Sequence, residues 1–403
     1  MALDALEEPG RGAETLASQD TRLFPRFHGN VGASKRRPER SEGNCHVAAL
    51  DLRLNEGYIL ASYLETTYRN PVIEEVWADP AIAGPDGDGF YWSYATDDDH
   101  EPLPRRLFKV ARSRDLVHWE THPPGTETGA FAAAIPNYGR YRASWAPDVR
   151  HLGTADWRFY GTLKFDDHDD AGTGGHGIFV ARSAGPTRFA EPSVLQRGPG
   201  FTVIDPCFYR STRLGRNFLY WGSGHAPIFG QELTKDGLSF APGSVPRAVL
   251  APTPGDWSDR LWEGVHVIEN PLSGEPIMLA SKVDTWSGPY QTFALRGGAH
   301  PLNPFTLAPG PAPLLAENAI WNRCGQVFVH TDAVGQLWIF YHAVRGDQVI
   351  PGTELFEANG RYGVPLRQMC MERLLFDGAG LPYVEGGGPS STRKTGPVVR
   401  RPD

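Results

Sequence analysis

Three acidic residues stand in apolar surroundings at widely separated points of the chain, and each is followed at once by proline or glycine. They are Asp79 in the sequence VWADP, Asp205 in VIDP and Glu263 in LWEG. A carboxylate in such surroundings is costly unless the fold needs it there. If the three side chains converge, two of them are enough to hydrolyse a glycosidic bond.

Hydrolysis of a glycosidic bond by water needs an ionised carboxylate as base and a protonated carboxyl group as acid. The acid keeps its proton near neutral pH only if burial or a neighbouring negative charge raises its pKa. A third carboxylate supplies that charge, so three acidic residues suit the task better than two. A base and an acid roughly 6.5–9.5 Å apart leave room for the attacking water and give inversion, whereas about 5 Å implies retention.

The three carboxylates belong to a repeat of five units. Each unit begins with a lead residue in an apolar strand and continues through an aromatic-rich run to further strand-like segments. The lead residues are Asp79, Asp148, Asp205, Glu263 and Gln326, and they lie 69, 57, 58 and 63 positions apart. A near-constant period of this size indicates a propeller or a solenoid, and short β-rich runs between turns indicate blades.

The predicted fold is therefore all-β, a five-bladed β-propeller with four-stranded antiparallel blades. A two-sheet sandwich is the structural alternative, but it would not explain the period. The innermost strand of a propeller blade lines the central channel. We therefore expect the five lead residues to border one funnel although they lie far apart in the chain.

The repeat also predicts the domain organisation. Residues 70–390 carry the repeat and are expected to form the propeller, which would be the catalytic domain. Residues 1–69 are charged and weakly patterned. We expect residues 1–44 to be mobile and residues 45–69 to be a lead-in packed on the propeller. Residues 391–403 are expected to form a C-terminal tail.

Composition narrows the possible partners. The formal net charge of −8 argues against a nucleic-acid partner, because phosphate binding needs a basic face. No stretch approaches the ~20 apolar residues of a membrane span, so no membrane partner is expected. The acidic N-terminus lacks the apolar segment of a secretory signal, and the predicted location is cytoplasmic. The four cysteines contain no CxxC pair, which argues against a zinc site.

Short motifs occur in a characteristic order: NPV at residues 70–72, ADP at 78–80, WAPD at 145–148, IDP at 204–206 and WEGVH at 262–266. In order and spacing they resemble the blade motifs of glycoside hydrolase family 43, over about residues 70–385. The resemblance implies a five-bladed propeller that cleaves α-L-arabinofuranosides, arabinans, β-xylosides or some galactans with inversion. It also implies that Asp79 is the general base, that Glu263 is the general acid, and that Asp205 raises the pKa of Glu263 and orients it.

The chain departs from the family pattern at two places. The family usually has a Gly-His pair at the start of the fifth blade, often beside a metal, where this chain has Gly325-Gln326. Because glutamine cannot act as an imidazole ligand, a central calcium is doubtful, and no metal or cofactor is predicted. The acid motif, usually Glu-Gly-Pro, reads Glu263-Gly264-Val265, a change that looks tolerable.

Besides Gln326, three residues are candidates for substrate binding, and each has a structural alternative. Trp145 could stack on a sugar ring or belong to the blade core. Asp148 could contact substrate or bond loop backbone. Arg367 lies where some xylosidases of the family carry a sugar-binding arginine, and its guanidinium fork suits neighbouring hydroxyls, but an edge-strand ion pair is equally consistent.

Other polar residues are expected to serve the fold. The acidic run at residues 166–170 lacks the spacing of a known calcium motif, so we expect a solvated loop. The basic run at residues 35–40 is expected to be a solvated linker. His176 and His342 are expected to be structural.

The predicted function is an inverting glycoside hydrolase that cleaves a pentoside, either an α-L-arabinofuranoside or a β-D-xyloside. An exo-acting enzyme is favoured, because a cytoplasmic enzyme would meet short oligosaccharides rather than polymers. The expected partner is thus an oligosaccharide or glycoside, and the sequence does not predict an oligomeric state. The alternative is a propeller that binds carbohydrate or scaffolds proteins without hydrolysis, or one recruited to a biosynthetic pathway.

Overall fold

A computed structural model gives the structure of this protein. It describes residues 49–54, 57–98, 100–101, 106–131, 141–165, 175–190, 192–224, 226–252, 261–283, 285, 288–307, 312–353, 355–357 and 360–400. The expectations for residues 1–44 and for the acidic run at 166–170 therefore lie outside the described residues.

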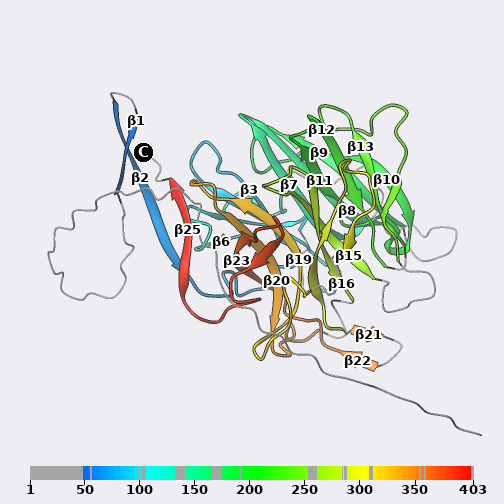
Figure 1. Ribbon diagram of the computed structural model, residues 1–403. Coiled ribbons are helices and arrows are strands. Elements are labelled where there is room, and N and C mark those ends of the chain that lie inside the picture. Colours follow the sequence, from blue (N-terminus) through cyan, green and yellow to red (C-terminus); the bar gives the residue numbers. More distant parts are fainter. Residues whose placement is uncertain are drawn as a thin grey trace, which may run out of the picture. The chain divides into compact units, whose positions relative to one another are not determined.

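The described residues form β-strands and one short 3-10 helix, η1 (Gly200–Val203). Five four-stranded antiparallel sheets follow one another along the chain (Figure 1), which confirms the predicted five-bladed propeller. Blade 1 contains β3 (Ala81–Ala83), β4 (Tyr91–Ala95), β5 (Lys109–Ser113) and β6 (Glu120–Thr121). Blade 2 contains β7 (Tyr141–Gly153), β8 (Asp156–Phe165), β9 (Gly175–Ser183) and β10 (Ser193–Pro199).

The remaining three blades have the same strand order. Blade 3 contains β11 (Cys207–Ser211), β12 (Arg216–Trp221), β13 (Ile228–Leu233) and β14 (Arg247–Leu250). Blade 4 contains β15 (Trp262–Glu269), β16 (Pro276–Lys282), β17 (Gln291–Arg296) and β18 (Thr306–Leu307). Blade 5 contains β19 (Trp321–Thr331), β20 (Leu337–Arg345), β23 (Gln368–Phe376) and β24 (Pro382–Val384), with the hairpin β21 (Leu355–Glu357) and β22 (Gly360–Tyr362) between its second and third strands.

A further sheet joins segments from both ends of the sequence. Its strands are β1 (Ala49–Leu54), β2 (Gly57–Tyr68) and β25 (Lys394–Arg400). β2 pairs antiparallel with β25, and Tyr68 lies opposite Lys394. The segment 391–403, expected as a tail, thus contributes a strand that pairs with the lead-in segment.

Aromatic side chains from successive blades fill the space between sheets. Phe108 of blade 1 lies 4.6 Å from Phe159 of blade 2, measured between ring centroids, and Phe159 stacks on Phe179 at 6.0 Å. All three side chains are fully buried. Gly161 leaves room for these rings, because a Cβ there would lie 2.6 Å from Phe108. The aromatic runs seen in the sequence therefore form the packing between blades.

A left-handed backbone position recurs in every blade and marks the repeat. It is occupied by Asp79, Ala146, Asp205, Gly264 and Gln326, with φ between 47° and 60°. In blades 2, 4 and 5 it coincides with a register shift in the innermost strand. The lead residues predicted from the sequence are therefore not all at equivalent positions. Asp148 lies two residues after the left-handed position of blade 2, and Glu263 lies one residue before that of blade 4. Bulges re-aim side chains where they occur, so the two residues take different directions from Asp79.

The ring closes between blades 5 and 1 without a shared strand. Blade 1 takes all its strands from the beginning of the propeller sequence, and blade 5 takes all its strands from the end. Backbone hydrogen bonds join the two blades, from Val72 N to Met369 O (2.8 Å) and from Trp77 N to Arg367 O (2.7 Å). The Asn70 side chain donates across the same boundary to Met371 O. We call this boundary the seam.

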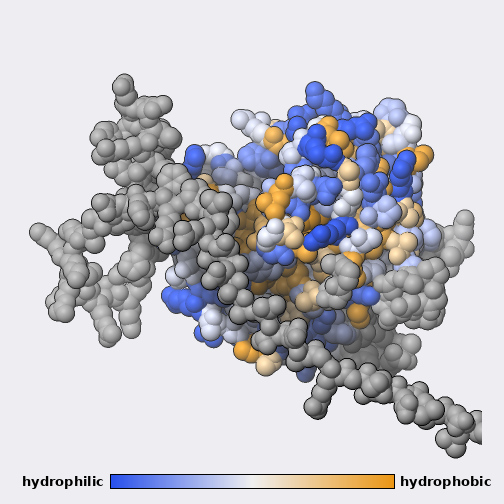
Figure 2. All heavy atoms as spheres, viewed as in Figure 1, coloured by the Kyte–Doolittle hydropathy of each residue, from blue (hydrophilic) through white to orange (hydrophobic). Residues whose placement is uncertain are grey.

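Figure 2 shows one face of the molecule, on which hydrophilic residues dominate the upper part, over blades 2 and 3, with apolar residues between them. The large apolar side chains are mainly inside, in clusters that span neighbouring blades. Among the described residues, no helix is long and apolar enough to cross a membrane.

Candidate active site

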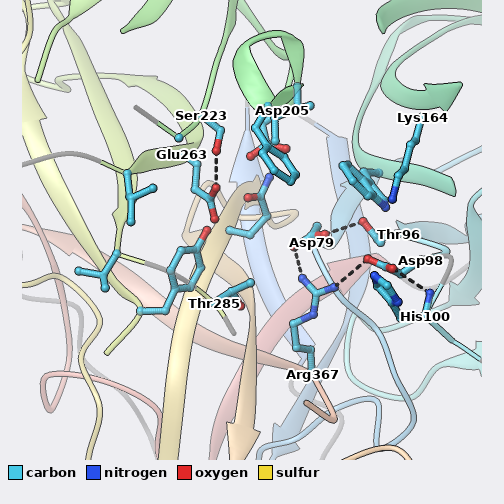
Figure 3. Close-up of a pocket in the computed structure, with 18 residues that line it drawn as sticks. Asp79, Thr96, Asp98, His100, Lys164, Asp205, Ser223, Glu263, Thr285 and Arg367 are labelled. Carbon is cyan, nitrogen blue, oxygen red and sulfur yellow. Dashed lines mark hydrogen bonds and ion pairs between the residues drawn. The ribbon is translucent and has the colours of Figure 1, made fainter. Parts of the chain in front are cut away.

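One cavity of about 490 Å³ contains the three predicted carboxylates. Asp79, Asp205 and Glu263 all line it, as do the predicted substrate-binding residues Trp145, Gln326 and Arg367; Asp148 does not. In Figure 3, Glu263 and Lys164 lie on opposite sides of Asp79 and Asp205. The propeller therefore brings together acids from blades 1, 3 and 4 in a volume typical of small-molecule sites.

The Asp79 carboxylate contacts side chains from both blades of the seam, blade 5 and its own blade 1. Arg367 Nη1 lies 3.3 Å from its Oδ1, and His342 Nδ1 lies 3.0 Å from the same atom. Thr96 Oγ1 donates to Oδ2 at 2.5 Å and itself accepts a hydrogen bond from Ala146 N. The carboxylate is thus fixed in direction by three side chains from two blades.

Electrostatics keep Asp79 ionised. Burial alone would raise the pKa of Asp79, but the Arg367 charge and the hydrogen bond from Thr96 outweigh it and hold the pKa below its usual value. His342 Nδ1 accepts a hydrogen bond from Asp79 N at 3.2 Å, so it is not a donor to this carboxylate. Burial lowers the pKa of His342 despite the nearby Asp79 carboxylate, so the imidazole is neutral and Arg367 is the cation. An ionised, hydrogen-bonded carboxylate that lines a cavity can accept a proton from water.

Asp205 meets the opposite conditions. Burial and then the negative charges of Glu263 and Asp79 raise the pKa of Asp205 well above its usual value. Its Oδ2 accepts a hydrogen bond from Gly264 N at 3.1 Å, and its own backbone N donates to Thr162 Oγ1. Because the interaction of two carboxyl groups is mutual, Asp205 and Glu263 titrate as a pair and retain one proton at a higher pH than a lone carboxyl would.

Glu263 is half-buried, and its carboxyl group reaches the cavity. Ser223 Oγ donates to its Oε2 at 2.5 Å (Figure 3). The next residue, Gly264, has a φ of 60°, and a Cβ there would collide with the side-chain oxygen of Gln326 and lie 3.2 Å from the Tyr290 hydroxyl. Glycine at position 264 therefore lets Gln326 and Tyr290 pack against the backbone that carries the acid.

Aromatic side chains form another part of the cavity wall. Trp145 and Phe201 are nearly parallel, with an interplanar angle of 11° and ring centroids 6.2 Å apart. His176 stacks on both rings, and Lys164 Nζ lies 5.2 Å from the Trp145 ring centroid. Phe201 is 55% exposed, so an apolar ring faces the opening as well as the interior.

Asp148 is buried and does not line the cavity. It is 3% exposed, and both of its oxygens contact the Arg150 guanidinium, at 2.5 and 2.6 Å. Its Oδ2 also accepts a hydrogen bond from Phe208 N at 3.2 Å, a backbone partner of the kind that the sequence left open. The structure gives Asp148 a place between blades 2 and 3.

Among the described residues, one group of side chains could offer metal ligands: Asp148, Cys207 and His266, whose ligand atoms lie within 4.8 Å of one another. Their surroundings do not fit a cation. Arg150 already places a positive charge on both Asp148 oxygens. His266 Nε2 accepts a hydrogen bond from Val329 N, which leaves the proton of the neutral ring on Nδ1 and no lone pair for a metal.

Several cavity residues were not singled out from the sequence: Thr96, Asp98, His100, Phe201, Ser223, Thr285 and Tyr290. His342, expected to be structural, contacts Asp79 directly. One local signal was available for Ser223, which stands between two glycines in a strand-like aromatic segment. His342 gave no such signal, because its partner is 263 residues away in the chain.

The family described as Glycosyl hydrolases family 43 matches residues 68–382 of the chain. No curated protein matches the chain.

Several solved structures are similar. A xylan β-1,4-xylosidase from Bacillus halodurans is 17% identical, with a TM-score of 0.58, and the alignment covers 81% of this chain and 59% of that one. A thermostable family-43 glycoside hydrolase is 22% identical, with 82% and 99% covered and a TM-score of 0.60. An α-L-arabinanase from Cellvibrio cellulosa, complexed with arabinohexaose, is 16% identical, with 77% and 96% covered and a TM-score of 0.57. At these identities the likeness shows the fold, and this chain spans only about 59% of the xylosidase.

Proposed function

Because the chain belongs to glycosyl hydrolases family 43, we propose that it is a glycoside hydrolase whose cavity cleaves a pentoside with inversion, either an α-L-arabinofuranoside or a β-D-xyloside. The observation that carries the proposal is the meeting of three carboxylates in one cavity, with the Arg367 cation and the Thr96 donor beside Asp79 and carboxylates beside Asp205. The similar structures include a xylosidase and an arabinanase, which supports the pentoside class.

Asp79 is the proposed general base. It is ionised, and its hydrogen bonds to Thr96 and its contact with Arg367 fix its direction. A water molecule between Asp79 and the anomeric carbon loses a proton to Asp79 as its oxygen bonds to that carbon. Attack from the face opposite the leaving group inverts the configuration.

Glu263 is the proposed general acid. It donates its proton to the leaving oxygen as the glycosidic bond breaks, so the base gains one proton and the acid loses one. Exchange with solvent restores both groups. Asp205 accepts a hydrogen bond from Gly264 N and shares one proton with Glu263, so the pair retains the proton that the acid must donate.

Arg367, Trp145 and Gln326 are proposed to bind the sugar. Arg367 Nη2 lies 4.0 Å from Asp98, so one guanidinium spans two carboxylates at the edge of the cavity. Trp145 offers a ring face on which a sugar can stack. The reaction is proposed to need no metal or cofactor, because water, base and acid complete it. Exo action on short oligosaccharides and a cytoplasmic location stay predictions.

The proposal is tested with nitrophenyl α-L-arabinofuranoside and β-D-xyloside and with the matching disaccharides. Proton NMR identifies the anomer released first. We expect one of the two glycosides to be cleaved with inversion, and we expect Asp79→Asn and Glu263→Gln to lose activity on the disaccharide. Release of the retained anomer, or full activity of either variant, would contradict the assignment.

A further inference from the structure

Ser223 occupies a rigid turn directly beside the proposed acid. The turn follows β12, and Ser223 is 3% exposed between Gly222 and Gly224, whose φ values are 131° and 74°. Gly222 N donates to Ile204 O at 2.9 Å, and Gly224 O accepts from Leu261 N at 2.8 Å. The turn is therefore bonded both to the segment that carries Asp205 and to the segment that carries Glu263.

We propose that Ser223 is a positioning residue that decides which oxygen of Glu263 delivers the proton. The inference rests on the proposed function, because it takes Glu263 as the acid. The Ser223 hydroxyl donates to Oε2, so Oε2 acts as acceptor and Oε1 carries the proton toward the cavity. This bond distinguishes the two oxygens and opposes rotation of the carboxyl group, which would turn the proton away from the leaving oxygen.

The same hydrogen bond assists the reaction as it proceeds. Glu263 becomes a carboxylate when it gives up its proton, and a hydrogen bond to a charged acceptor is stronger than one to a neutral group. The Ser223 hydroxyl is held in place before the charge develops, so it stabilises the transition state more than the ground state. Its contribution grows with the degree of proton transfer.

Leaving-group basicity separates this role from a structural one. A sugar hydroxyl is a poor leaving group and needs the proton, whereas a nitrophenolate leaves with little help from an acid. Loss of Ser223 should therefore slow a disaccharide far more than the nitrophenyl glycoside of the same sugar. A variant that only loosened the fold would slow both substrates alike.

The test compares Ser223→Ala, Ser223→Cys and Ser223→Thr on a disaccharide and on its nitrophenyl counterpart. For Ser223→Ala we expect kcat to fall about 10- to 100-fold on the disaccharide and less than about threefold on the nitrophenyl glycoside. The threonine variant keeps the hydroxyl and should recover most of the loss. The cysteine variant, nearly the same size but a weak donor, should fall between the two. Activity on the nitrophenyl substrate also shows that each variant is folded.

Ser211→Ala is the matched control. Ser211 is also a buried serine of blade 3, but it does not line the cavity. The Ser211→Ala variant should change kcat by the same factor on both substrates. An equal loss on both substrates for Ser223→Ala would overturn the inference.

Glu263→Gln, measured beside Ser223→Ala, separates this inference from the proposed function. If Glu263→Gln shows the leaving-group dependence and Ser223→Ala does not, only the role of Ser223 is wrong. If Glu263→Gln slows both substrates equally, Glu263 is not the acid, and the proposed function fails with the inference.

Discussion

Asp79 and Asp205 share a local sequence and a backbone conformation, but their electrostatic surroundings are opposite. Each precedes a proline, each has a left-handed backbone, with φ of 55° and 58°, and each is buried. Against the effect of burial, Arg367 and the hydrogen bond from Thr96 lower the pKa of Asp79. Burial and two neighbouring carboxylates raise the pKa of Asp205. The motif places the carboxyl group, and the neighbouring blades decide whether it is ionised.

The difference follows from where each residue lies in the ring. Asp79 lies at the seam, where blade 5 contributes Arg367 and His342. Asp205 lies between blades 2 and 4, whose nearest contributions are a threonine hydroxyl and a backbone amide. Two copies of one structural position can therefore serve as base and as partner of the acid.

Removal of the base should have the largest effect. Asp79→Asn keeps the size of the side chain but cannot take a proton, so kcat should fall by about 10²–10⁴-fold even with a nitrophenyl leaving group. The measurement is steady-state kinetics on the nitrophenyl pentoside. Equal losses for Asp79→Asn and Asp205→Asn on this substrate would show that the two residues do not differ as the comparison requires.

Loss of Asp205 should act on the acid side of the mechanism. Asp205→Asn removes one carboxyl group of the pair with Glu263, so the remaining acid loses its proton at lower pH. The alkaline limb of the kcat/KM profile should move to lower pH. Activity at neutral pH should fall roughly 10- to 100-fold on a disaccharide. An unchanged alkaline limb would remove Asp205 from the ionisation of the acid.

Loss of Arg367 should act on the base side and with the opposite sign. Arg367→Gln removes the cation that lowers the pKa of Asp79, so this pKa rises and the acid limb of kcat/KM moves to higher pH. At neutral pH the loss should be about tenfold, mainly through weaker sugar binding. Lys282→Gln, on a residue outside the cavity lining, is the charge-matched control. An acid limb that stays at the same pH in Arg367→Gln would contradict the assignment.

The smallest effect expected is on stability, at the backbone that Asp205 holds. Gly264→Ala forces alanine to a φ of 60° and against Gln326, and should cost about 1–3 kcal/mol of unfolding free energy in urea. Gly335→Ala adds a Cβ at a φ of 85° with nothing within 4 Å, so it measures backbone strain alone. Gly264→Ala with Gln326→Ala should recover only the part due to collision; full recovery would show that the left-handed backbone costs nothing there.

The sequence predicted the blades well because their signals are local. Aromatic runs such as Phe90-Tyr91-Trp92 and the turns between them recur within each unit, and the structure confirms the five sheets. The phase of the repeat was wrong in blades 2 and 4, because its marker is a backbone conformation shared by residues as different as Asp79, Ala146 and Gly264. No side-chain pattern reveals that conformation.

The candidate site was predictable where acids stand out and hidden where neutral groups act. Asp79, Asp205 and Glu263 were conspicuous as carboxylates in apolar segments, and all three line the cavity. Tyr290 and His342 are ordinary in their local sequences and gain meaning only from their partners in space. Asp148 looked like a lead residue, yet it is buried in an ion pair with Arg150, two positions later, and does not line the cavity.

The seam between blades 5 and 1 links the lower pH limit of activity to the closure of the propeller. Arg367 accepts a backbone hydrogen bond from Trp77 in the first blade while its side chain lies on Asp79. If the first and last blades separated slightly, the cation would move away from the carboxylate before any strand unfolded. The base would then bind protons more readily, so mild denaturant should move the acid limb of kcat/KM to higher pH while the circular dichroism spectrum stays unchanged. The pH dependence of kcat/KM would thus report how closely blades 1 and 5 pack against each other.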